Sequence, residues 1–121
     1  MRVVAVALGA DLVGVLVFAA IGRSSHVEGL DILGVAGTAA PFLGGLLVGW
    51  AVGQVWRAPA RLLAGLWAVG GAAIVGLALR GAVTGRLPWT FVLVASVSLA
   101  VLVLGWRLIV RAVLATRRAR T

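Results

Sequence analysis

Four long apolar stretches separated by short polar connections dominate the sequence. They cover about 3–21, 32–56, 60–79 and 89–110, and in each the apolar and small residues occupy every face of a helix. A helix that is apolar all round is buried in a large core or in a membrane, and about 20 such residues cross the hydrocarbon region. The pattern predicts an all-α polytopic membrane protein, a four-transmembrane-helix bundle in a single membrane domain, 1–121.

Composition narrows the class of protein. Of the 121 residues, 63% are hydrophobic and 12% are charged, whereas soluble domains are about half apolar and a quarter charged. The chain has no cysteine, one histidine and three acidic residues, which is too small a set of ligands for a metal site. We therefore expect a membrane protein with no cofactor and no bound metal.

Arginines account for the net charge of +8, and they lie at the ends of the apolar stretches. This placement favours lipid headgroups over nucleic acid as their partner. Three arginines fall on one side of the predicted bundle, namely Arg23, Arg80 and Arg86, and seven on the other, namely Arg2, Arg57, Arg61, Arg111, Arg117, Arg118 and Arg120. Because cytoplasmic loops carry the excess of positive charge, we expect both termini in the cytoplasm (N-in/C-in) of a bacterial or archaeal cell membrane.

Small residues recur every four positions in the second and third stretches. The first ladder consists of Gly37, Pro41, Gly45, Gly49 and Gly53, and the second of Ala60, Ala64, Ala68, Ala72 and Gly76. Small residues let helix backbones approach closely in a bilayer. The ladders predict that these two helices pack together; the alternative is an interface within a homodimer or a larger membrane complex. Pro41 removes a backbone donor and is the predicted kink or hinge.

Asp11 and Arg107 are charged residues that lie deeper within the apolar stretches, away from their ends. Asp11 lies about 12 Å and Arg107 about 10 Å from the same predicted membrane face, at 1.5 Å per helical residue. Intramembrane ions usually face a bundle interior or a partner, so the matched depths predict that these residues face each other. The pair either fixes helix register or is a carboxylate linked to protons or substrate. A third alternative is that Arg107 extends to the interface while Asp11 bonds to a hydroxyl group or a neighbouring protomer.

The polar connection 22–31 holds the remaining candidate chemistry. Arg23, Ser25, His26 and Glu28 could gate a ligand or an ion, with His26 titrating near neutral pH; the alternative is a solvated turn. A hydrolytic triad would have to come from this one loop, without a nucleophile elbow or an evident oxyanion hole. We therefore expect no enzymatic activity.

The five tryptophans divide by depth. Trp56, Trp89 and Trp106 are typical of interface belts. Trp50 and Trp67 lie deeper, where the indole N–H requires an acceptor. Packing against the glycine ladders is the favoured interpretation for these two, and contact with a lipid-like ligand is the alternative.

Several segments together resemble a known family. These are the aspartate of the first helix, FAAIGRSSHVEG, TAAPFLGG, and LGWRLIVR at the end of the last helix. They are similar to the small four-helix prokaryotic membrane proteins of domain of unknown function 3054. The family pattern maps onto Asp11, Gly22, Arg23, His26, Pro41, Phe42, Trp106 and Arg107. The resemblance implies a polytopic membrane protein and brings no known activity.

Two functional hypotheses follow. The first is a small inner-membrane structural or accessory subunit, or an assembly partner, with a buried Asp11–Arg107 pair. The second is a homo-oligomeric transporter of small molecules, or one coupled to protons, that uses Asp11.

Overall fold

The computed structural model describes residues 2–24, 32–86 and 88–120. These residues form four long α-helices and one short 3-10 helix, and they contain no strand. In chain order the elements are α1 (Arg2–Ser24), α2 (Ile32–Gly53), η1 (Val55–Arg57), α3 (Leu62–Thr84) and α4 (Trp89–Arg120). Each α-helix is long and apolar enough to cross a membrane. The predicted all-α class and the number of helices are therefore confirmed, and the apolar helices indicate a membrane protein.

The boundaries between α2 and α3 differ from the prediction. α2 ends at Gly53 rather than at Trp56, because Gln54 adopts a left-handed backbone conformation (φ 49°, ψ 50°) and η1 follows. α3 begins at Leu62 instead of residue 60 and continues past residue 79 to Thr84. Gly85, with φ 70°, then ends the helix, as glycine commonly does.

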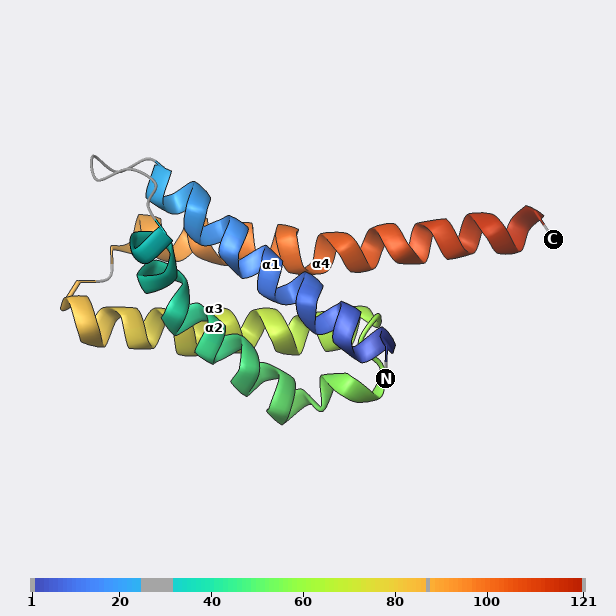
Figure 1. Cartoon of the computed structure of the whole chain (residues 1–121), viewed down its shortest axis with the longest axis horizontal. Coiled ribbons are helices and arrows are strands. Elements are labelled where there is room, and N and C mark those ends of the chain that lie inside the picture. Colours follow the sequence, from blue (N-terminus) through green and yellow to red (C-terminus); the bar gives the residue numbers. More distant parts are fainter. Residues whose placement is uncertain (1, 25–31, 87, 121) are drawn as a thin grey trace.

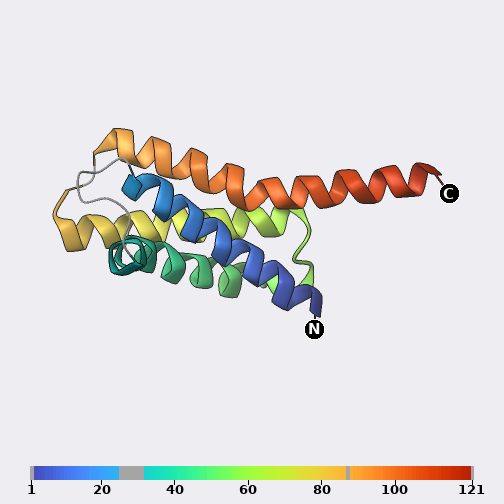
Figure 2. The ribbon, with the colours of Figure 1, turned by 45° about the horizontal axis from the view of Figure 1, so that its top comes forward.

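The last helix is longer than predicted. The apolar stretch predicted an end near residue 110, but α4 continues to Arg120. At 1.5 Å per residue its 32 residues extend about 48 Å, well beyond a hydrocarbon core of about 30 Å. Its last third projects past the other three helices, at the end of the bundle where the N-terminus and η1 also lie (Figures 1 and 2).

The closest backbone approach in the bundle is between α2 and α3. A Cβ at Gly45 would overlap the carbonyl oxygen of Gly71, and one at Gly49 would overlap that of Trp67. Gly53 lies under the Trp67 side chain in the same way. The four-residue spacing on α2 thus brings glycines against α3, in the manner of small-residue packing in membranes.

Two details of the ladder prediction need correction. Gly37 lies outside the packed interface, since a Cβ there would meet nothing within 4 Å. Gly71, which belongs to neither predicted ladder, is instead a central contact of α3. The remaining predicted small residues of α3 are buried, namely Ala64, Ala68, Ala72 and Gly76. Pro41 lies inside α2, which continues through it as one helix.

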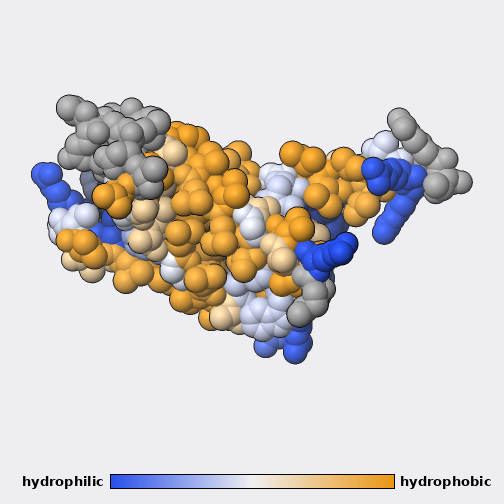
Figure 3. Space-filling model, in the orientation of Figure 1, coloured by the Kyte–Doolittle hydropathy of each residue, from blue (hydrophilic) through white to orange (hydrophobic). Residues whose placement is uncertain are grey.

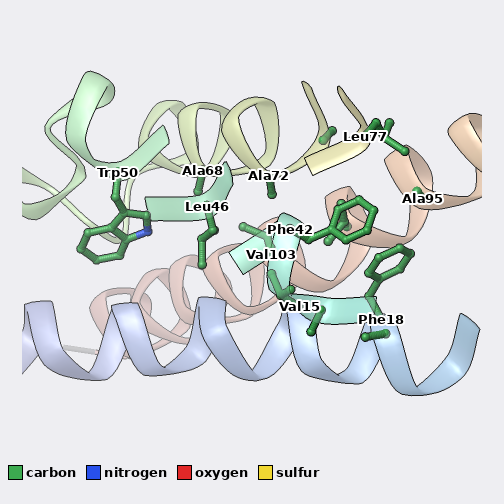
Figure 4. Packing of buried hydrophobic residues seen from close by; sticks show 14 of the residues in the cluster. Val15, Phe18, Phe42, Leu46, Trp50, Ala68, Ala72, Leu77, Ala95 and Val103 are labelled. Atoms are coloured by element: carbon green, nitrogen blue, oxygen red, sulfur yellow. The ribbon is translucent and has the colours of Figure 1, made fainter. Parts of the chain in front are cut away.

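The core occupies the space between the four helices. Near the end away from the termini, three aromatic rings from three helices meet. Phe18 and Phe42 pack edge to face with centroids 4.9 Å apart, and Phe91 lies 6.3 Å from Phe42. Phe18, Phe42 and smaller buried side chains such as Leu46 and Val103 are seen together in Figure 4. The outer surface is broadly hydrophobic over the middle of the bundle, with hydrophilic atoms gathered at its ends (Figure 3).

Candidate functional site

Asp11 of α1 and Arg107 of α4 form a fully buried ion pair. Both side chains have zero exposed fraction. The Arg107 guanidinium donates from Nη1 to Asp11 Oδ1 at 2.7 Å and from Nη2 to Oδ2 at 2.9 Å. These two parallel bonds form the bidentate arrangement that suits a planar guanidinium and a carboxylate. The structure thus brings together the two residues whose depths match in the sequence.

Two tryptophans complete the hydrogen bonding of the carboxylate. The indole Nε1 of Trp50, from α2, donates to Asp11 Oδ2 at 2.8 Å, and that of Trp106, from α4, donates to Oδ1 at 2.8 Å. An ionised carboxylate has about four acceptor positions, so all of them are used. The prediction that Trp106 anchors at the membrane interface is wrong, because its N–H points inward to the carboxylate.

The guanidinium of Arg107 also fixes the backbone around it. Its Nε donates to the carbonyl oxygen of Pro59 at 2.8 Å, and Nη1 donates to the carbonyl oxygen of Val103 at 3.0 Å. The guanidinium carbon lies 4.3 Å from the centre of the Trp106 ring, within cation–π range. Through Pro59, the buried pair is connected to the turn between α2 and α3.

Gly65 of α3 provides the space for the Arg107 side chain. A Cβ at this position would come within 2.5 Å of Leu104 Cδ2 and 2.8 Å of Arg107 Cδ. Neither Gly65 nor Pro59 stands out in the sequence. The sequence does suggest a partner for Trp50. A deep indole N–H requires an acceptor, and Asp11 is the one carboxylate within an apolar stretch.

The chemistry of this site is that of a closed charge cluster. The carboxylate and guanidinium neutralise each other, and four donors surround the two oxygens. A proton or a cation could reach Asp11 only after one of these bonds breaks. The cluster joins α1, α2, α4 and the turn that precedes α3, so its geometry is suited to fixing the mutual arrangement of the helices.

Of the predicted site residues in the 22–31 connection, the structure describes only the helical backbone of Arg23. Arg23 belongs to the last turn of α1, whereas Ser25, His26 and Glu28 lie outside the described residues. The described part of the chain contains no group of three histidine, cysteine or acidic residues that could hold a metal. Trp67 covers Gly53 and does not reach Asp11.

A second basic feature lies at the opposite end of the bundle. The guanidinium of Arg80 sits 4.6 Å from the centre of the Phe91 ring. Both residues line a hollow of about 480 Å³ together with Thr84 and Arg86. This hollow contains cationic side chains but none of the buried charge-cluster residues.

Comparison with known protein families gives a match over most of the chain. Neither a curated protein nor a solved structure matches the chain. The profile of DUF3054, described as a protein of unknown function, matches residues 8–110. The match includes Asp11, both tryptophans that bind it, and Arg107. The chain therefore belongs to the DUF3054 family.

Proposed function

We propose that this protein is a structural or accessory subunit, or an assembly partner, of a larger complex in the cell membrane. Both termini lie in the cytoplasm, and the protein has no enzymatic activity of its own. The proposal includes association with a second copy or with other membrane proteins. It excludes nucleic acid, metal and cofactor as partners.

The saturated carboxylate of Asp11 is the observation that carries this proposal. A carboxylate that binds a proton or substrate during transport must become accessible from each side of the membrane. Asp11 instead has zero exposed fraction and accepts four hydrogen bonds from Trp50, Trp106 and Arg107. Such a network supports a fixed architecture, because each donor comes from a defined position on α2 or α4.

The projecting end of α4 supports a role in assembly. We call residues 111–119, all of which are exposed, the helical arm. The arm continues α4 past the other three helices (Figures 1 and 2), so its exposed side chains are available to a partner. It carries two large apolar side chains, Val113 at 45% and Leu114 at 47% exposure, and its arginines can contact an anionic partner or headgroups.

Site-specific photo-crosslinking tests the proposal. A photoreactive amino acid replaces Leu114 in the arm, and in a matched control it replaces Val97, an apolar residue of α4 that is 55% exposed within the apolar part of the helix. We expect a discrete protein adduct from position 114 in intact membranes and none from position 97. Mass spectrometry identifies the partner, and deletion of its gene should reduce the amount of this protein.

Two results would contradict an accessory role. One is a lone monodisperse protein after mild solubilisation, with arm crosslinks only to lipid. The other is an unchanged amount of protein after the crosslinked partner is removed.

A transporter that uses Asp11 is the competing proposal, supported by the general functional bias of ionisable residues in membrane spans and by the hollow beside Arg80. It requires water to reach Asp11. Cysteine introduced at Val15, one turn beyond Asp11 and fully buried, should react with a small water-soluble thiol reagent in a transporter. Complete protection in native membranes would exclude this alternative.

A further inference from the structure

The turn between α2 and α3 forms a basic hollow on the surface. We use the name basic hollow for the depression of about 250 Å³ lined by Gly53, Gln54, Arg57, Ala58, Arg61, Leu63, Ala64 and Trp67. Sites that enclose a whole small molecule usually measure about 300–1,000 Å³. The smaller volume and the two guanidiniums suit one anionic group.

The two arginines of the basic hollow are exposed and can bind an anion from outside the chain. The protein has three acidic residues. Asp11 is saturated by Arg107 and two indoles, while Glu28 and Asp31 belong to the connection between α1 and α2. Among the described residues, neither Arg57 nor Arg61 has an ion-pair partner. Guanidiniums bind phosphate well because their planar N–H groups match its oxygens.

The start of α3 adds to the positive electrostatic potential of the two arginines. Arg61 occupies the N-cap position with an extended backbone (φ −71°, ψ 144°), and its side chain makes no capping hydrogen bond. The first turn, beginning Leu62–Leu63–Ala64, contains no acidic residue. The N-terminal end of a helix carries a partial positive charge, which here acts in the same direction as the two guanidiniums.

An apolar groove continues from the basic hollow along the bundle. The groove runs between α2 and α3, and it shares Trp67 with the hollow. Its floor contains Gly49, Gly70 and Gly71, and its walls include Val52, Leu66 and Ile74. Leu66 and Ile74 are eight residues apart, so the groove extends about 12 Å along α3.

We propose that the basic hollow binds the phosphate of an anionic phospholipid, and that an acyl chain of the same lipid lies in the groove between α2 and α3. The glycines that bring the two helices together also create the space for the chain. A basic hollow at the interface end and an apolar groove directed away from it match the two parts of one lipid. This inference is independent of the proposed accessory role.

Arg107 links the proposed lipid site to the buried cluster. Its Nε donates a hydrogen bond to the carbonyl oxygen of Pro59, and Pro59 lies between Arg57 and Arg61 in the sequence. Gln54, with its left-handed backbone, sets the direction of the turn on the other side. The backbone between the two arginines is therefore held by a buried contact.

A lipid titration followed by native mass spectrometry tests the proposal. The full-length protein in detergent is titrated with phosphatidylglycerol, and separately with phosphatidylcholine carrying identical acyl chains. We expect one phosphatidylglycerol to bind on the order of 25-fold more tightly, since each basic side chain near an anionic headgroup contributes about a factor of five. Glycerol phosphate and inorganic phosphate, which lack acyl chains, should bind much more weakly.

The first pair of variants tests the basic hollow, and each variant removes two positive charges, so the two have the same net charge. R57Q/R61Q should lose the preference for phosphatidylglycerol over phosphatidylcholine. R111Q/R117Q, which removes two exposed arginines from the arm, should keep it. Equal losses in both variants would mean that charge attracts the lipid without a defined site, and would overturn the proposal.

The second pair tests the groove. A Cβ at Gly70 would meet nothing within 4 Å, so Gly70→Leu fills the groove without disturbing α2–α3 packing. Gly105→Leu is the control, because a Cβ there is equally unhindered and the residue lies outside the groove. We expect weaker phosphatidylglycerol binding in the first variant alone.

Three further outcomes would overturn the lipid assignment. Binding of inorganic phosphate or glycerol phosphate as tight as that of phosphatidylglycerol would identify a soluble phosphate site. Unchanged lipid binding by Gly70→Leu would show that no acyl chain occupies the groove. Dissociation of a dimer by Gly70→Leu, with lipid binding unchanged, would assign the groove to a second copy of the chain.

Discussion

Gly65 and Arg107 are in direct steric contact across α3 and α4, and the absence of a side chain at Gly65 allows the guanidinium to reach Asp11. A Cβ on residue 65 would lie 2.8 Å from Arg107 Cδ, where real Cβ atoms are essentially never found. The ion pair of α1 and α4 thus depends on a glycine of a third helix. Substitutions at Gly65, at Arg107 and at the residues that contact them should therefore change the stability of the bundle.

Gly65→Ala should destabilise the bundle. The added Cβ would push against Arg107 Cδ and Leu104 Cδ2, and overpacking of this kind costs about 1–3 kcal/mol. Unfolding in detergent measures the change. Gly70→Ala, with open space around the new Cβ, is the control on the same helix, and equal stability of the two variants would contradict the steric explanation.

Asp11→Asn should lower stability more strongly, since it leaves the Arg107 charge buried without a counterion. Breaking a buried pair from one side costs about 3–5 kcal/mol. The asparagine amide also places its own N–H groups opposite N–H donors whose hydrogen bonds the carboxylate accepts. Unfolding of the purified variant gives the loss.

Adding Arg107→Gln to Asp11→Asn completes a double-mutant cycle. The double variant should be less destabilised than the sum of the two single variants, because it contains no unpaired buried charge. Losses that simply add would show that Asp11 and Arg107 are not coupled, contrary to the bidentate contact.

Trp50→Phe and Trp106→Phe should each weaken the bundle by about 1.5–3 kcal/mol, the usual contribution of a hydrogen bond to a charged group. Each change removes one 2.8 Å bond to Asp11 and keeps most of the aromatic contact. Trp89→Phe is the control, since Trp89 is 74% exposed and should change stability by less than about 0.5 kcal/mol. Thermal unfolding compares the three variants.

Gly49→Ala and Gly37→Ala make the same change on the same helix and should differ in effect. At Gly49 the Cβ would overlap Trp67 and approach Gly71 Cα to 3.1 Å, whereas at Gly37 nothing lies within 4 Å. We expect a loss of about 1–3 kcal/mol for the first and a change within about 0.5 kcal/mol for the second. Equal effects on unfolding would mean that close packing of α2 and α3 contributes little.

The orientation in the membrane can be tested directly because the chain contains no cysteine. With both termini in the cytoplasm, an impermeant maleimide added to intact cells should label Arg86→Cys and leave Ala115→Cys unlabelled. Both positions are exposed in the structure, and permeabilised cells should show labelling of both. Labelling of Ala115→Cys alone in intact cells would show that the C-terminus lies outside the cell, opposite to the proposed orientation.

The sequence determined the four helices and the depth of their charges. A bilayer requires long apolar segments whose backbone bonds are satisfied internally, so the apolar stretches directly predicted the helices. Because helical rise is constant, the positions of Asp11 and Arg107 predicted that they lie at the same level. The end of α4 was less predictable, since its basic arm has no apolar run to mark where the helix stops.

Tertiary structure alone decided which tryptophans bind Asp11. A helix that is apolar all round has no polar face to indicate its rotation, so the sequence could not distinguish Trp50 from Trp67 as the donor. The contact of Gly49 with α3 fixes that rotation and directs Trp50 to the carboxylate. Gly65, Pro59 and Gly71 acquire their roles only when backbones meet, because their contribution is space or a carbonyl oxygen rather than a recognisable side chain.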